Sequence, residues 1–261
     1  MSSNAEGAAP PPPAFCVVVP MYNEETGVET CVRRICRVLA AQPGRTALYV
    51  VNDGSKDATG AILERLLPLF PQLTVITHPK NRGYGSALRT GMQEAAAAGF
   101  DYALFMDSDL TNDPDDIPRF AEKMRLGYDV IKATRYSQGG KVDGVPFRRV
   151  IVSVVGNRLA HLLFRLPVHD CTNGFRAVRT KLLAQMRLTE NKFPIIMEEL
   201  YWLKFLTRSF VELPVTLTHR SGQHRPTSFV YRPAVFWNYL KWPLKAAAGL
   251  RPDIRQGEER A

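Results

Sequence analysis

Short apolar segments alternate with longer amphipathic segments between residue 15 and about residue 133. The apolar segments have the length and composition of buried strands, and they cover residues 15–19, 47–51, 73–77, 102–106 and 130–133. The amphipathic segments have apolar residues at helical spacing, and they cover residues 24–41, 58–70, 86–98 and 115–126. This alternation predicts an α/β fold in which a mainly parallel sheet is covered by helices on both faces.

The pattern after residue 133 is less regular. Residues 150–165 have two different faces at helical spacing: an apolar face of Ile151, Val155, Leu159 and Leu162, and a polar face of Ser153, Asn157, His161 and Arg165. We expect this helix to be partly buried against the sheet. A loop at 167–174, a helix around 197–207 and a short strand at 211–215 complete the expected elements.

The chain divides into three expected regions. Residues 1–14, with four consecutive prolines, predict a disordered leader that lacks the basic start and apolar centre of a signal peptide. Residues 15–228 form the expected catalytic domain. Residues 229–261 form an aromatic and basic helical tail, in which we expect Pro243 to break any long helix. No stretch reaches the roughly twenty apolar residues that span a bilayer.

Charge and cysteine content narrow the classes of function. The net charge of +9 favours an anionic partner, which could be a nucleic acid, a phosphorylated substrate or an acidic membrane surface. The four cysteines show neither metal-ligand nor disulfide spacing, so we expect a reducing, cytosolic setting.

The segment Asp107-Ser108-Asp109 closes the fourth predicted strand. While the strand stays extended, its two-residue period places Asp107 and Asp109 on one side. Two carboxylates so close are costly unless a cation neutralises them, and oxygen ligands favour Mg²⁺ or Mn²⁺ shared with substrate phosphates. The segment therefore predicts a metal site for a nucleoside diphosphate, although Asp-x-Asp alone is also common in turns and helix caps.

The other unusual loops also follow predicted strands, where ligands gather in parallel sheets. The chain has neither a Gly-x-Gly-x-x-Gly motif nor a Gly-Lys-Ser/Thr phosphate loop, which argues against a dinucleotide site and a P-loop. Asp53 either accepts a hydrogen bond from the imino N–H of uracil or guanine, or acts as a turn and cap residue. The loop 81–86, with Gly83, either allows close approach of an anion to the backbone or is a flexible connection.

Six segments carry a resemblance to a known family: 19–25, 51–57, 81–87, 106–110, 133–136 and 170–176. In this order and spacing they resemble the family 2 glycosyltransferases, and within them the dolichyl-phosphate mannose synthase-like group. The resemblance implies a GT-A nucleotide-diphospho-sugar transferase fold. It also implies inverting, metal-dependent transfer of a hexose from a GDP-mannose or UDP-glucose type of donor to a polyprenyl or dolichyl phosphate.

The resemblance also assigns site residues. The donor would be held by Pro20, Tyr22, Glu24, Val51, Asp53, Asn81, Gly83, Asp107, Ser108, Arg135, Arg220 and Arg225. Asp107 and Asp109 would bind Mg²⁺ or Mn²⁺, and Arg149 and Arg176 would bind the acceptor phosphate. Catalytic roles would fall to Asp109, Arg135, Asp170 and Glu199.

The acceptor remains open between two classes. A phosphate monoester is already ionised and needs arginines, whereas a hydroxyl acceptor needs a general base, for which Asp170, Glu198 and Glu199 are the candidates. The alternative is therefore a soluble family 2 glycosyltransferase with a hydroxyl acceptor. With a lipid acceptor, we expect a cytoplasmic protein in peripheral contact with the membrane through residues 150–165 and the tail. The ordered donor motifs argue against nucleic acid as the partner.

Overall fold

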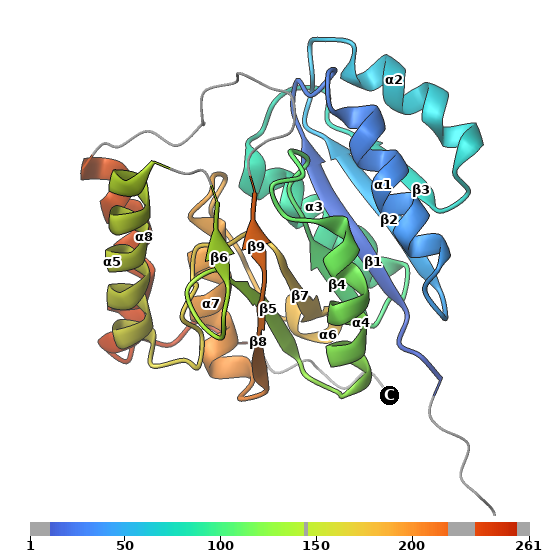
Figure 1. Cartoon of the computed structure of the whole chain (residues 1–261). Coiled ribbons are helices and arrows are strands. Elements are labelled where there is room, and N and C mark those ends of the chain that lie inside the picture. The colour runs from blue at the N-terminus through green and yellow to red at the C-terminus, as the bar shows by residue number, and fades with distance from the viewer. Residues whose placement is uncertain (1–10, 144–145, 219–232, 255–261) are drawn as a thin grey trace, which may run out of the picture.

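A seven-stranded sheet forms the centre of the computed structural model, which describes residues 11–143, 146–218 and 233–254 (Figure 1). In spatial order the strands are β3 (Leu73–Thr77), β2 (Thr46–Asn52), β1 (Phe15–Met21), β4 (Tyr102–Phe105), β7 (Arg176–Arg179), β5 (Val130–Thr134) and β8 (Phe210–Pro214). Neighbouring strands are parallel, except that β7 is antiparallel to both β4 and β5. The predicted mainly parallel sheet is confirmed.

Helices cover both faces of this sheet, as the sequence predicts. One face packs against α1 (Val28–Ala40), α2 (Thr59–Leu66) and α4 (Ile117–Arg125). The other packs against α3 (Tyr84–Ala97), α5 (Phe147–Phe164), α6 (Thr180–Leu183), α7 (Ile195–Leu206) and α8 (Pro233–Ala247). Strand β1 serves both cores, because alternate side chains point to opposite faces: Val17 and Val19 join the first, Cys16 and Val18 the second.

Several helix boundaries differ from the predicted ones because of local backbone chemistry. The helix expected over 58–70 ends at Leu66 and continues as the 3₁₀ helix η1 (Leu67–Leu69), which contains a proline. The helix expected from residue 115 begins as the 3₁₀ helix η2 (Pro114–Asp116), capped by the Asp113 side chain. Helix α8 runs through Pro243, so our expectation that this proline ends the helix is wrong.

The strand directions bring all candidate loops to one edge of the sheet. Strands β1, β2, β4 and β5 are parallel, so the residues that follow them emerge together. Strand β7 runs the opposite way, and its first residue, Arg176, pairs with Phe105 and Lys132 near the ends of β4 and β5. The antiparallel β7 therefore delivers the loop before it, residues 167–174, to the same edge as Asp107.

Helices α5 and α8 lie side by side at the end of the molecule away from α2 (Figure 1). The apolar face of α5 is exposed, with Val155 60% and Leu162 69% accessible, whereas Asn157 on its polar face is buried. The expected partial burial is therefore present with the polar side turned inward. The tail helix α8 packs on α7, where Trp242 lies against Tyr201 with ring centroids 5.4 Å apart.

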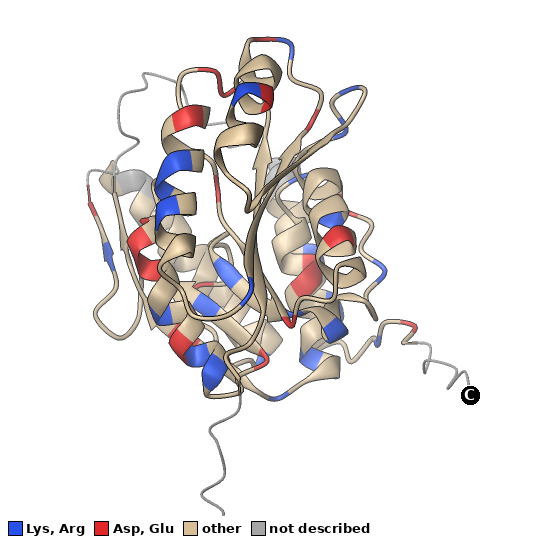
Figure 2. Cartoon of the chain, turned by 90° about the vertical axis from the view of Figure 1, so that its right-hand side faces the viewer, with Lys and Arg blue, Asp and Glu red and all other residues tan. Residues whose placement is uncertain are grey.

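The remaining features are small. A second sheet pairs β6 (Lys141–Val142) with β9 (Thr216–Leu217) in parallel. All four cysteines are buried and unpaired. Among the described residues, none of the helices has the length and apolar character that a membrane span requires. Figure 2, which views the molecule from the right-hand side of Figure 1, shows basic and acidic positions interspersed along the helices.

Candidate active site

Asp107 and Asp109 lie just beyond the end of β4, and both are partly exposed. Asp107 Oδ1 accepts a hydrogen bond from the Tyr84 hydroxyl at 2.9 Å, and Asp109 Oδ1 accepts from the Thr111 hydroxyl at 2.8 Å. The backbone between Asp109 and Thr111 turns sharply, since Leu110 adopts a left-handed conformation with φ 55°. Each carboxylate is thus oriented by a hydroxyl.

Tyr84 lies beside Asp107 and was not among the predicted site residues, although it belongs to segment 81–87. It begins α3, and its ring stacks on Phe193 with centroids 4.5 Å apart. Burial, together with the negative charge of Asp107, raises the pKa of Tyr84 well above its ordinary value. Tyr84 therefore keeps its proton and donates a hydrogen bond to Asp107.

Asp53 is buried at the end of β2 and fixes the loop 81–83. Its Oδ1 accepts from His78 Nδ1 at 2.7 Å and from the Arg82 N–H at 2.9 Å, and its Oδ2 accepts from the Gly83 N–H at 2.7 Å. His78 Nε2 in turn lies 2.9 Å from Thr90 Oγ1. Gly83 is at φ 95°, and a Cβ there would lie 2.3 Å from the Asn191 carbonyl oxygen, so this turn requires glycine. Asp53 thus positions the loop, and its contact with a base stays a prediction.

The other predicted donor residues lie at the same edge with different exposure. Pro20 and Val51 are buried inside β1 and β2. Tyr22 is 38% exposed, Asn81 is exposed, and Glu24 and Ser108 are partly exposed. The donor roles of these residues stay predictions.

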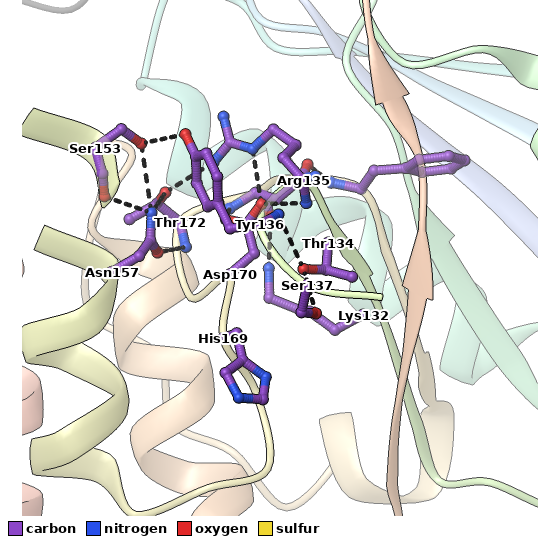
Figure 3. A network of polar contacts seen from close by, with 12 residues as sticks. Lys132, Thr134, Arg135, Tyr136, Ser137, Ser153, Asn157, His169, Asp170 and Thr172 are labelled. Atoms are coloured by element: carbon purple, nitrogen blue, oxygen red, sulfur yellow. Dashed lines mark hydrogen bonds and ion pairs between the residues drawn. The ribbon is translucent and has the colours of Figure 1, made fainter. Parts of the chain in front are cut away.

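Arg135 and Asp170 form a bidentate ion pair behind this edge (Figure 3). Arg135 Nε donates to Asp170 Oδ2 at 2.7 Å, and Nη2 donates to Asp170 Oδ1 at 2.8 Å. Burial alone would raise the pKa of Asp170, but the guanidinium of Arg135 and the ammonium of Lys132 hold it below its ordinary value. A carboxylate so stabilised is a weak proton acceptor. In this structure Asp170 holds Arg135, and its catalytic role stays a prediction.

Lys132 is fully buried beneath this pair, and its Nζ donates to the carbonyl oxygen of Asn173. Desolvation, reinforced by the positive charge of Arg176, lowers the pKa of Lys132 from 10.5 to about 8. Lys132 could not be selected from the sequence, since it is one lysine within a predicted strand. It holds the backbone of the loop that carries Asp170.

The lowered pKa of Lys132 has a consequence for stability. Between about pH 8 and pH 10.5 the unfolded chain binds this proton and the folded chain does not, so the cost to stability of burying this charge decreases as pH rises. We expect the unfolding free energy of the wild type to rise relative to that of Lys132→Met over this window, by at most about 3 kcal/mol. Parallel urea titrations from pH 7 to 10 measure the difference, and a constant difference would contradict the lowered pKa.

Arg176 and Glu199 lie inside the protein, each 0% exposed, and bind each other. Arg176 Nε and Nη2 donate to the two Glu199 oxygens at 2.6 Å each, and Nη1 donates to the Gly174 carbonyl at 2.8 Å. This placement favours a structural role for both residues, because the guanidinium is enclosed and Glu199 is ion-paired. The acceptor-phosphate role of Arg176 and the catalytic role of Glu199 stay predictions.

The remaining candidates are placed as follows. Glu198 is buried and accepts from the Thr189 N–H and hydroxyl and from the Glu190 N–H. Arg149 lies in the first turn of α5, and its side chain is outside the described part of the structure. Arg220 and Arg225 fall within 219–232, also outside the described residues.

The donor set at Asp107 and Asp109 is suited to a hard divalent cation. Both ligands are carboxylates, and among the described residues no group of three or more His, Cys, Asp or Glu side chains gathers around a common point. Mg²⁺ and Mn²⁺ take one or two carboxylates together with substrate phosphates. The residues present therefore fit a metal that is completed by the donor.

Three mannosyl-transferring relatives match most of the chain. The polyprenol monophosphomannose synthase of Mycolicibacterium smegmatis is 28% identical over 88% of this chain and 86% of its own length. The dolichol-phosphate mannosyltransferase of Pyrococcus furiosus is 32% identical over 87% of this chain, which spans 63% of that longer protein. The undecaprenyl-phosphate mannosyltransferase of Micrococcus luteus is 28% identical over 91% of this chain and 97% of its own length.

Solved structures and a family model agree on the fold. Glucosyl-3-phosphoglycerate synthase of Mycobacterium tuberculosis in complex with phosphoglyceric acid superposes with a TM-score of 0.67 at 20% identity, over 92% of this chain and 81% of that one. Its complex with Mn²⁺, UDP and glucosyl-3-phosphoglycerate gives a TM-score of 0.64, also at 20% identity, with 92% and 81% covered. The model of glycosyl transferase family 2 matches residues 16–187. The chain is a glycosyltransferase of GT-A fold and belongs to glycosyl transferase family 2.

Proposed function

We propose that the protein transfers a hexose, with inversion, from a GDP-mannose or UDP-glucose type of donor to a polyprenyl phosphate. The names of the three relatives, each acting on a polyprenyl or dolichyl phosphate, support this acceptor class. The convergence of the loops after β1, β2, β4 and β5 supports a single donor site at this edge of the sheet.

The donor end of the site must neutralise negative charge. Cleavage of the sugar–phosphate bond leaves a nucleoside diphosphate whose negative charge increases in the transition state. Asp107 and Asp109 would hold Mg²⁺ or Mn²⁺, which when bound neutralises the diphosphate. The Tyr84 and Thr111 hydroxyls keep the two carboxylates oriented, and Arg135 adds a positive charge nearby.

The acceptor assignment rests on three carboxylates, the candidates for a general base, which are all engaged with partners inside the protein. Asp170 is paired with Arg135, Glu199 is paired with Arg176, and Glu198 accepts three hydrogen bonds from residues 189 and 190. All three are buried. A hydroxyl acceptor requires a base within reach, whereas an ionised phosphate monoester does not. This arrangement favours the phosphate acceptor over the hydroxyl alternative.

A lipid acceptor also requires contact with a membrane, and the exposed apolar face of α5 supplies a surface for it. Phe147, Val155 and Leu162 are 77%, 60% and 69% exposed, and Trp237 on the neighbouring α8 is 62% exposed. The basic residues Arg158, Arg165 and Lys245, also exposed, flank this surface in sequence. An apolar helix face with basic flanks is typical of peripheral binding to anionic membranes.

Two acidic residues introduced on the exposed apolar face of α5 should therefore weaken binding to lipid. We expect Val155→Glu/Leu162→Glu to lower the affinity for vesicles containing anionic lipid at least about tenfold, because each acidic charge opposes the surface potential and apolar burial is lost. Co-sedimentation with vesicles measures the effect. The matched control is Leu69→Glu/Leu126→Glu, since these leucines are 56% and 63% exposed on the α2 and α4 side. Equal losses in both double variants would contradict the assignment of this face.

Transfer from labelled donors tests the proposed function. We would incubate labelled GDP-mannose or UDP-glucose with Mg²⁺ or Mn²⁺ and a short-chain polyprenyl phosphate, and count label in the organic phase. We expect organic-soluble label with one of the two donors. Metal-dependent donor binding without organic-soluble label would move the acceptor to the hydroxyl class.

A further inference from the structure

The polar face of α5 holds a buried amide that the proposed mechanism does not use. Asn157 is 1% exposed, although the opposite face of its helix is apolar and open to solvent. Its Oδ1 accepts from the Thr172 N–H at 3.1 Å, and its Nδ2 donates to the Ser153 carbonyl at 2.9 Å and to Thr172 Oγ1 at 3.1 Å (Figure 3). The amide therefore holds both the backbone and the hydroxyl of Thr172.

These contacts orient the Thr172 hydroxyl and leave its proton without an acceptor in the network. A threonine hydroxyl has one proton to donate and two lone pairs to accept with. Asn157 Nδ2 and Arg135 Nη2, each at 3.1 Å, fill the two lone pairs. The proton is left for an acceptor outside this network, and Thr172 is partly exposed.

Arg135 is oriented by Asp170 and by the Thr172 hydroxyl. Asp170 takes its Nε and one Nη2 proton, Thr172 takes the other, and Nη1 carries no contact to the residues drawn in Figure 3. The side chain is 14% exposed. Arg135 and Thr172 are hydrogen-bonded to each other, so their remaining N–H and O–H donors lie close together. Two such donors, one of them cationic, can bind two oxygens of one phosphate group.

We propose that Arg135 Nη1 and the Thr172 hydroxyl together bind a substrate phosphate, and that Asn157 is the positioning residue for the Thr172 hydroxyl. The proposal rests on the proposed function for the presence of phosphate at this edge. It adds Thr172 as a direct ligand of the substrate and explains why α5 turns a polar side inward. The phosphate belongs either to the nucleotide donor or to the polyprenyl acceptor, and the two ligands are tested separately.

Binding measured by calorimetry tests the proposal without relying on turnover. The ligands are GDP and UDP with Mn²⁺, and a short-chain, water-soluble polyprenyl phosphate. We expect Asn157→Ala and Thr172→Val each to weaken one class of ligand about tenfold, as loss of one hydrogen bond to a charged group does. Thr172→Ser keeps the hydroxyl and should stay within about twofold of the wild type. The double variant Asn157→Ala/Thr172→Val should be no weaker than Thr172→Val alone, because both changes remove the same contact.

His161→Ala is the matched control for loosening of α5. His161 lies one turn after Asn157 on the same face and bonds the same loop at the Val168 carbonyl, at 2.9 Å, rather than at Thr172. We expect it to lower the melting temperature while leaving phosphate affinity unchanged. Equal losses of affinity in His161→Ala and Asn157→Ala, unchanged affinity in Thr172→Val, or a wild type that binds neither ligand would overturn the proposal. Altered binding in a protein that makes no lipid product would leave the proposal standing and reject only the acceptor class.

Discussion

Replacement of Asp109 by asparagine is expected to lower the rate of glycosyl transfer at least about 100-fold with little change in melting temperature. Residues that merely support metal ligands typically cost 10–100-fold on mutation, so loss of a direct ligand should cost at least as much. The amide retains an oxygen that can accept from the Thr111 hydroxyl, which now bonds Asp109 Oδ1, so the loop should keep its shape. Initial rates measured over a range of Mn²⁺ concentrations test both the rate and the apparent metal affinity.

Asp115→Asn is the matched control for this experiment. Asp115 is an exposed aspartate whose contacts are with Arg34 and Arg37 on the surface. We expect it to transfer at the wild-type rate with the wild-type metal dependence. A rate for Asp109→Asn that stays within about threefold of this control would remove Asp109 from the proposed metal site.

The largest expected effect on stability belongs to the ion pair of Arg176 and Glu199. Removal of one partner leaves the other charge buried and uncompensated, which typically costs about 3–5 kcal/mol. We therefore expect Glu199→Gln and Arg176→Met each to lower the free energy of unfolding by about that amount. Denaturant titration measures it directly, and the melting temperature should fall by about 2–4 °C for each kcal/mol.

A double variant distinguishes the ion pair from a catalytic role. Arg176→Met/Glu199→Met removes both charges of the pair, so neither is left uncompensated, and it should recover part of the loss seen in each single variant. Glu199→Gln that unfolds like the wild type but no longer transfers sugar would contradict this structural assignment. It would restore the role of base that the sequence suggested for Glu199.

The sequence predicted the sheet well because most of its strands are continuous apolar segments that alternate with amphipathic ones. It also predicted that Asp53, the loop 81–85 and Asp107 meet at one edge, since the carboxyl ends of parallel strands share that edge. Strand β7 was not predicted, because Arg176–Arg179 has four residues, two of them arginines, and no alternation that could be recognised. That strand determines which way the loop carrying Asp170 and Thr172 faces.

Side-chain pairing was the least predictable feature. Nothing in the spacing of Arg176 and Glu199 shows that they bind each other rather than a ligand. For α5, periodicity revealed the two faces but not which of them lies inside, because the usual rule places apolar residues in the core. Asn157, an amide on the polar face, could have been selected as a buried anchor only if that orientation had been known.

The proposed acceptor is a phosphate monoester, and a comparison of two lipids would test this proposal. A polyprenyl phosphate and the polyprenol of the same chain length would be incubated with the same labelled donor and metal. We expect organic-soluble label with the phosphate only, because no base is required and the buried carboxylates are held in ion pairs or hydrogen bonds. Transfer to the polyprenol at a rate equal to or greater than that to the phosphate would contradict it.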